Sequence, residues 1–274
     1  RRLAHNTLKL YIVMEQRFMT NLHFKVLIQN CQRSYSFEST MTLKIIRGNI
    51  FTSKCQTLVN TINCAGVMGA GIALECRLRF PEMFDQYVQF CNEDKIKVGL
   101  LWVYKSANPW ILNFPTKKHW KYPSKEEYLH SGLKNFIATY KSRGIESIAF
   151  PLLGADKGGL AQDRSISIME HYLSDLDLDV ELYEYDPFSK DDLFDKTKDW
   201  MLSNPMESII AATNLRRNYV EKAIEAFGKN DIFQLNQLAS VDGIGIKTLE
   251  KIFKTAQSSS FESPDNSSDQ GSLF

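Results

Sequence analysis

A glycine-rich stretch between residues 58 and 80 has the residue types that hold phosphate groups. It opens with the apolar pair Leu58-Val59, which predicts a buried strand, and it ends in apolar residues at helical spacing from Ile72 to Phe80. Between them lie Gly66, Gly69 and Gly71. Glycine lets backbone N–H groups approach an anion, and a helix N-terminus adds partial positive charge. The spacing fits neither a Walker A motif nor G-x-G-x-x-G, so a tight turn with glycines for packing remains an alternative.

Two asparagines, Asn60 and Asn63, mark the end of the predicted strand. A carboxamide donates and accepts hydrogen bonds at once, which suits the hydroxyl groups of a ribose. Their position beside the glycine loop therefore favours a phosphate-binding loop over a purely structural turn.

A second candidate is the lysine pair Lys117-Lys118. Lys117 follows a predicted strand and lies between Phe114 and Trp120, so we expect it to be partly desolvated. Desolvation lowers the pKa of a lysine and frees an amine that can attack a carbonyl-like carbon. A solvated basic loop is the alternative.

The residues after this lysine suit a nucleic acid. His119 and Trp120 could stack on a nucleobase, and Lys118 could contact a phosphate. The alternative for Trp120 is a buried ring whose indole N–H is satisfied within the protein.

The pattern L-V-N-x-x-N-C-x-G-V-M-G-x-G-I-A resembles the ADP-ribose-binding loop of macrodomains. The likeness covers roughly Met41 to Pro187. It is greatest to the DNA ADP-ribosyl glycohydrolases, the antitoxins of DarT/DarG pairs, and to their relative the terminal ADP-ribose glycohydrolase. The resemblance implies that Asn63 positions the distal ribose. The ADP-ribose contacts that it implies in this loop are Asn60, Asn63, Gly66, Val67, Met68, Gly69 and Gly71.

Three further segments match in order. In Gly48-Asn49-Ile50, macrodomains usually have an aspartate that accepts a hydrogen bond from the adenine amino group. Asn49 can accept the same bond without charge assistance, or it can be a turn residue. In Thr116-Lys117-Lys118, the resemblance implies that Lys117 is the catalytic residue, which attacks or stabilises the anomeric carbon of the distal ribose.

The third segment is a second glycine loop, which in macrodomains closes over the diphosphate and distal ribose. Its implied ligand contacts are Gly154, Ala155, Asp156, Lys157, Gly158, Gly159 and Leu160. The human-type relative has a catalytic aspartate at the position of Gly158, so this departure favours the DarG branch. Asp156 could act as an acid or could order the loop.

The elements that position these residues alternate between strands and helices. We predict strands at 43–47, 100–104, 110–114, 146–150 and 180–185, and helices at 81–91, 125–143 and 163–173. Ser124 with Glu127 predicts a capping box for the helix 125–143. The pattern predicts a three-layer α/β/α macrodomain with a mixed central sheet over residues 41–187. We expect the ligand across the carboxyl ends of the strands.

A small all-α domain is predicted after a polar linker at 188–205. Residues 206–256 resemble a helix–hairpin–helix module, with Thr213 or Asn214 capping its second helix and Gly243-Ile244-Gly245 as the turn. Gly243, Gly245, Lys247 and Lys251 are its implied contacts to one DNA phosphate. Seven Lys or Arg and six Asp or Glu in this segment argue against strong independent DNA affinity, and a protein-docking hairpin is the alternative. Residues 257–274 are Ser-rich and are expected to be disordered.

Composition limits the remaining possibilities. The 274 residues suffice for one good-sized core and a small module, and a net charge of +1 excludes a strongly basic surface overall. Five cysteines without C-x-x-C spacing argue against a disulfide framework or a cysteine zinc site, and favour a reducing, cytoplasmic location. No apolar run reaches the length of a membrane span. Residues 1–40 lack sustained periodicity, and we expect an upstream extension with little fixed structure.

The leading hypothesis is an ADP-ribosyl glycohydrolase that removes ADP-ribose from nucleic acid, most simply from DNA bases. Its implied partners are ADP-ribosylated DNA and a cognate ADP-ribosyltransferase toxin, and the mechanism needs no metal or cofactor. The alternatives are a non-catalytic ADP-ribose reader and a phosphatase acting on ADP-ribose 1''-phosphate. A reader has no need of a lysine at position 117.

Overall fold

The protein was analysed as a computed structural model, which describes residues 43–229 and 231–258. Within these ranges the sheet has six strands in the order β1-β6-β5-β2-β4-β3, and among them only β3 is antiparallel to its neighbour. The strands are β1 Leu43–Gly48, β2 Thr57–Asn63, β3 Trp102–Tyr104, β4 Trp110–Lys117, β5 Ser147–Pro151 and β6 Asp179–Tyr185. The mixed sheet was predicted, and it is confirmed. The prediction for residues 1–40 lies outside the described residues, as does that of a disordered tail at 257–274 from residue 259 onward; Gln257, the first residue of that tail, is helical.

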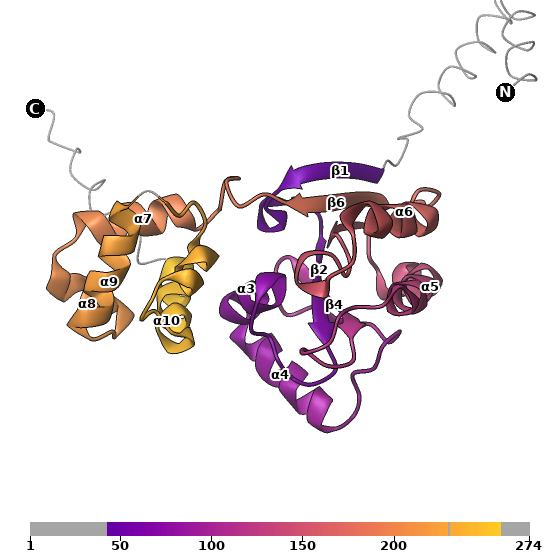
Figure 1. Ribbon diagram of the computed structural model, residues 1–274, viewed down its shortest axis with the longest axis horizontal. Helices are drawn as coiled ribbons and strands as arrows, with labels where there is room; N and C mark the ends of the chain where they lie inside the picture. Colours follow the sequence, from indigo (N-terminus) through magenta and orange to yellow (C-terminus); the bar gives the residue numbers. More distant parts are fainter. Residues whose placement is uncertain (1–42, 230, 259–274) are drawn as a thin grey trace, which may run out of the picture. The chain divides into compact units, whose positions relative to one another are not determined.

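Helices cover both faces of this sheet. On one face lie α3 Gly71–Arg79 and α4 Pro81–Asn92, whose Cys76, Met83 and Tyr87 pack on Leu58 and Ile111. On the other lie α5 Glu126–Arg143 and α6 Gln162–Leu173, which bury Phe136 and Met169 against Val59, Phe114 and Phe150 (Figure 1). The central strands β2, β4 and β5 therefore have an apolar core on both sides, which confirms the predicted α/β/α layers.

The prediction that Ser124 caps α5 is wrong. The N-cap is Lys125, which makes no side-chain capping bond. The Ser124 backbone N–H instead donates to the Gly158 carbonyl at 2.9 Å, and its hydroxyl is buried without a partner among the described residues. Ser124 therefore belongs to the wall of the second glycine loop rather than to the helix start.

Helix α5 packs tightly on β4 through a glycine. A Cβ atom placed on Gly132 would overlap the ring of Phe114, which is fully buried on β4 three residues before Lys117. We expect Gly132→Ala to lower the free energy of unfolding by about 1–3 kcal/mol, because overpacking outweighs the better helix propensity of alanine. Urea unfolding should show this loss. Gly228→Ala, at a helix position with nothing within 4 Å, should be neutral or stabilising, and equal effects at the two sites would contradict the packing argument.

The C-terminal region is helical, with its own core. It contains α7 Phe194–Ser203, α8 Met206–Thr213, α9 Arg217–Gly228, the 3-10 helix η3 Leu235–Ser240 and α10 Ile246–Gln257. Phe194 and Met201 of α7 are buried in this core, so the predicted linker 188–205 includes one of its helices. The prediction that Thr213 or Asn214 caps α9 is wrong, because Asn214 ends α8 in the left-handed region at φ 51° and Arg216 is the N-cap of α9.

The C-terminal helices contact the α/β part of the chain, residues 43–185, through α3. Leu78 of α3 is buried in the helical core, and Arg77 and Arg79 of α3 form ion pairs with Glu250 and with Asp191 and Asp192. Over the ranges 43–229 and 231–258, none of the helices is both long and apolar enough to span a membrane.

Candidate functional site

The segments that follow β2, β4 and β5 meet at one edge of the sheet. These three strands are neighbours and run parallel, so their carboxyl ends lie side by side. The Cys64 backbone N–H donates to the Lys117 carbonyl at 3.1 Å, which joins the first glycine loop to the end of β4. A Cβ atom on Gly71 would lie 3.5 Å from the Lys157 side chain, which places the second glycine loop against the first. The structure thus brings together the three segments that the sequence singled out.

Asn63 shapes the first glycine loop from within. Its Oδ1 accepts a hydrogen bond from the Ala65 N–H at 2.8 Å, and its Nδ2 donates to the Val67 carbonyl at 2.5 Å. The Tyr87 hydroxyl donates to the Asn63 carbonyl at 2.8 Å. Tyr87 was missed by the sequence reasoning, because only its burial in the amphipathic helix α4 could have indicated it. Asn63 therefore fixes the turn 63–67 from which the rest of the glycine loop continues.

Asn60 lies inside the sheet. It is fully buried, and its Nδ2 donates to Oδ1 of Asn113, its register partner on β4, at 2.9 Å. Its own Oδ1 has no partner among the residues described. The side chain of Asn60 thus ties two strands together and does not reach the surface where a ligand could lie.

Asn49 directly follows the strand β1. Its Oδ1 accepts from the Phe51 N–H at 3.0 Å and caps the short 3-10 helix η1 Ile50–Thr52, while its buried Nδ2 has no partner in the described chain. The last residue of β6, Tyr185, pairs in register with Gly48 and keeps 52% of its surface exposed. An exposed aromatic ring beside Asn49 is a surface on which an adenine could stack. The sequence reasoning missed Tyr185, although its position at a strand end was a usable signal.

Lys117 is the last residue of β4, and Thr116 before it is buried. The half-buried amine of Lys117 donates a hydrogen bond to the carbonyl of Lys157 in the second glycine loop. Burial lowers the pKa of Lys117, and the nearby carboxylate of Asp156 opposes this shift. The amine therefore lies between the two loops and releases its proton more readily than a surface lysine does.

The second glycine loop is a closed turn. The Leu160 N–H donates to the Gly154 carbonyl at 2.9 Å and closes the turn. Within it lies the one-turn helix η2 Asp156–Gly158. Gly154 has a φ of 70°, and a Cβ atom there would crowd Ser124 and Leu160. Only glycine meets both conditions, so the shape of the loop depends on Gly154.

An exposed aromatic patch follows Lys117, formed by His119, Trp120 and Tyr122. The rings of His119 and Trp120 stack with centroids 5.5 Å apart, and those of His119 and Tyr122 lie 5.8 Å apart. Trp120 keeps 49% of its surface exposed, so the buried-tryptophan alternative is wrong. Lys118 is exposed, and Lys121 lies over the Trp120 ring at 5.1 Å. Flat rings and amines together can bind bases and phosphates.

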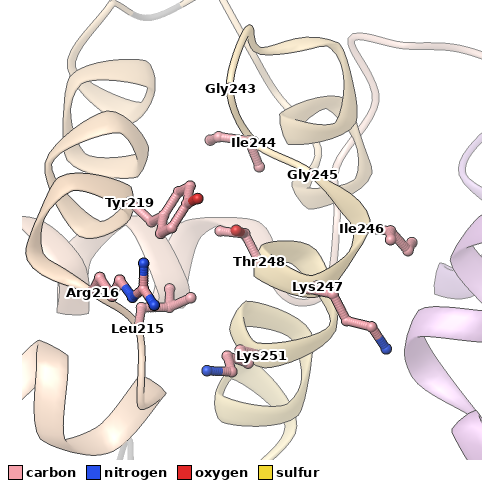
Figure 2. A pocket seen from close by; sticks show the side chains of 10 residues that line it. All are labelled: Leu215, Arg216, Tyr219, Gly243, Ile244, Gly245, Ile246, Lys247, Thr248 and Lys251. Atoms are coloured by element: carbon pink, nitrogen blue, oxygen red, sulfur yellow. The ribbon is translucent and has the colours of Figure 1, made fainter.

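A pocket of about 590 Å³ opens between α9 and α10 in the C-terminal region (Figure 2). Three cationic side chains and no carboxylate line it, together with the two glycines of the predicted turn. Gly245 is the N-cap of α10, and Ile246 and Lys247 are its first two residues, so their backbone N–H groups lack acceptors within the helix. The residues around the pocket are Leu215, Arg216, Tyr219, Gly243, Ile244, Gly245, Ile246, Lys247, Thr248 and Lys251.

Two side chains that the sequence reasoning missed complete this pocket. Thr248 is 5% exposed and points from α10 toward Tyr219 (Figure 2). Arg216 comes from the neighbouring helix and belongs to no recognisable motif. All four predicted contacts, Gly243, Gly245, Lys247 and Lys251, lie here, and Lys251 also donates to the Asn214 carbonyl.

Comparisons with known proteins show what this chain is similar to. Residues 59–169 match the family model described as Macro domain. A curated relative from Thermus aquaticus, named DNA ADP-ribosyl glycohydrolase, is 39% identical over 149 residues, or 53% of this chain and 41% of the relative. The solved macrodomain of Thermus aquaticus DarG is 39% identical to this chain. The match covers 53% of this chain and 99% of that structure, with a TM-score of 0.49. The structure of Thermosipho africanus DarTG in complex with ADP-ribose is 32% identical over 53% of this chain and 42% of that one, with a TM-score of 0.51. The chain thus spans less than half the length of this curated relative.

Proposed function

This chain belongs to the macrodomain family, and we propose that it is a glycohydrolase that removes ADP-ribose from modified DNA. The name of its curated relative supports this activity, and the structure with bound ADP-ribose supports the ligand. The observation that carries the proposal is the position of Lys117. The amine is half-buried, has a lowered pKa and lies where the two glycine loops meet. Such an amine can attack a sugar carbon as a nucleophile or stabilise charge at that carbon.

The proposed reaction distributes roles among the loops. Backbone N–H groups of the loops after Asn63 and after Gly154 hold the diphosphate, and the rigid Asn63 turn positions the distal ribose. The Lys117 amine leaves the Lys157 carbonyl and attacks or stabilises the anomeric carbon as its bond to the DNA base breaks. Where the amine forms a bond to the anomeric carbon, it gives up a proton that the departing base takes. Water then adds to the same carbon, the bond between carbon and lysine breaks, and the amine regains a proton from that water.

A release assay tests this function. Single-stranded DNA carrying ADP-ribose on thymidine, and separately on guanine, would be incubated with the protein, and free ADP-ribose would be measured. We expect release from one of the two substrates. Binding of ADP-ribose with release from neither would support the reader hypothesis, and release of phosphate from ADP-ribose 1''-phosphate alone would support the phosphatase.

The partners follow from the proposed activity. A DNA glycohydrolase of this kind acts against a DNA ADP-ribosyltransferase, so a cognate transferase is its expected functional partner. The cytoplasmic location expected from the cysteine content remains a prediction.

For the C-terminal pocket we propose contact with a DNA phosphate, which would keep the enzyme near its substrate. The lining by Arg216, Lys247 and Lys251 and the free N–H groups of α10 support this role. The helix–hairpin–helix assignment itself remains a prediction.

Replacing Arg216 with alanine should weaken DNA binding equally for all sequences and reduce the salt slope of log K by about 1, because one phosphate contact is lost. Fluorescence anisotropy at several salt concentrations would measure both. Arg217→Ala is the matched control, since Arg217 is paired with Glu207 and does not line the pocket. An unchanged slope for Arg216→Ala would favour the protein-docking alternative.

A further inference from the structure

The segment that follows β6 is hydrogen-bonded to side chains of the C-terminal region. The buried Gln234 side chain donates to the Asp186 carbonyl at 2.8 Å and to the Ser189 carbonyl at 3.2 Å. The Gln237 side chain donates to the Pro187 carbonyl at 2.9 Å. Two glutamine amides of the η3 region thus satisfy the backbone carbonyls of Asp186, Pro187 and Ser189, which fixes the path of the segment 186–189.

Gln237 also joins this segment to the start of η3. Its Oε1 accepts from the Phe233 N–H at 2.6 Å and from the Gln234 N–H at 3.1 Å. The rings of Phe188 and Phe233 meet edge to face with centroids 5.2 Å apart, and both keep part of their surface exposed. The two segments therefore form one unit, and Gln237 bonds to both sides of it.

Tyr185 ends β6 and directly precedes the segment 186–189 that the η3 region holds. It pairs in register with Gly48 of β1, so it joins this segment to the strand end where Asn49 lies. Burial raises the pKa of the Tyr185 hydroxyl, and hydrogen bonding to Gln237 opposes the rise. Asn236 in turn donates to Glu75 at 2.6 Å, so the η3 region contacts α3, whose N-terminus follows the first glycine loop.

We propose that the η3 region forms a wall of the adenosine end of the ADP-ribose site, with Gln237 as a positioning residue for Tyr185. This inference rests on the proposed function only in taking ADP-ribose as the ligand. Tyr185 is next to Asn49 across the β1–β6 pair, where the adenine is expected, and its ring is half exposed. Gln237 holds the backbone two residues beyond it, which keeps the ring in one orientation and lowers the cost of ordering it on binding.

The test measures ADP-ribose affinity by calorimetry with the full chain. Base–aromatic stacking sets the expected loss at about tenfold in Kd for Tyr185→Ala, with Tyr185→Phe close to wild type. Gln237→Ala should lose a similar factor. The double variant should bind no more weakly than Tyr185→Ala alone, because both changes remove the same contact. Gln89→Ala removes an exposed glutamine of α4 that bonds to Glu93; it is the matched control and should bind like wild type.

A second measurement separates positioning from general damage. In the release assay, Gln237→Ala should raise KM by about the same factor and leave kcat unchanged, because the chemistry takes place at Lys117. Wild-type affinity in Gln237→Ala, or additive losses in the double variant, would overturn this inference and leave the proposed reaction untouched. Wild-type binding without any release would instead refute the reaction and leave the inference in place.

Discussion

Replacing Lys117 with alanine is expected to abolish release of ADP-ribose from DNA while ADP-ribose affinity stays within a few fold of wild type. We expect the rate of release to fall by about 10³-fold or more, the scale seen when an enzyme loses its nucleophile. Affinity should survive because the binding contacts proposed here come from backbone N–H groups of two loops that are closed by their own hydrogen bonds. Release kinetics and calorimetry on the same preparation would separate the two quantities.

Lys118→Ala is the matched control for this experiment. Lys118 is the next residue along the chain and is exposed, so its loss should affect DNA affinity and raise KM without removing activity. Lys117→Arg should be as inactive as Lys117→Ala, since a guanidinium does not give up its proton. Release by Lys117→Ala at the wild-type rate would remove the lysine from the mechanism.

The pH dependence of release should report the same amine. Burial lowers the pKa of Lys117 below its ordinary value of about 10.5, so the neutral, reactive form is reached at lower pH than for a surface lysine. The rate should therefore rise with pH and level off above the lowered pKa. Asp156→Asn removes the carboxylate that opposes the shift, so the rise should move to lower pH. A profile that stays in place in Asp156→Asn would indicate that another group titrates.

The sequence predicted the parts of the site that depend on local chain chemistry. Glycine loops after strands and a lysine at a strand end are short-range patterns, and the parallel sheet brings their carboxyl ends together. Ser124 shows where a local pattern fails. Its spacing to Glu127 fits a capping box, but the bond to the Gly158 carbonyl holds Ser124 in the loop wall. A contact to a residue 34 positions along the chain overrode the local signature.

The same limit applies to Asn60, Tyr185 and Arg216. Asn60 lies three residues before Asn63 in one motif, yet its amide pairs across the sheet with Asn113, which only the strand register reveals. The surroundings of Tyr185 come from η3, which begins about 50 residues further along the chain. Those of Arg216 come from α10, which begins about 30 residues further along. Residues whose roles depend on such long-range packing leave little trace in periodicity or spacing.

Replacing Arg79 with methionine should cost about 3–5 kcal/mol of stability, the largest loss that we expect from a single side chain outside the apolar cores. Arg79 is 6% exposed on α3 and contacts three carboxylates, Glu75 at 2.8 Å, Asp192 at 2.7 Å and Asp191 at 3.4 Å. Burial raises the pKa of Glu75 and of Asp191, and the Arg79 charge opposes both shifts. Without the guanidinium, two buried carboxylates would remain with no cation beside them.

Arg77→Met is the control that isolates burial from charge. Arg77 lies on the same helix and pairs with Glu250 of α10 at 2.8 Å, but both partners are more than a fifth exposed, so we expect a loss of about 1 kcal/mol or less. Urea unfolding at neutral pH would measure both variants. Glu75→Gln should partly rescue Arg79→Met, because it removes one of the carboxylates left unpaired. Similar losses for Arg77→Met and Arg79→Met would show that the buried network is not what holds the C-terminal helices to α3. A large difference would show that the helix following the first glycine loop is fixed from the C-terminal side, so that the fold of the helical region and the shape of the ADP-ribose site depend on the same arginine.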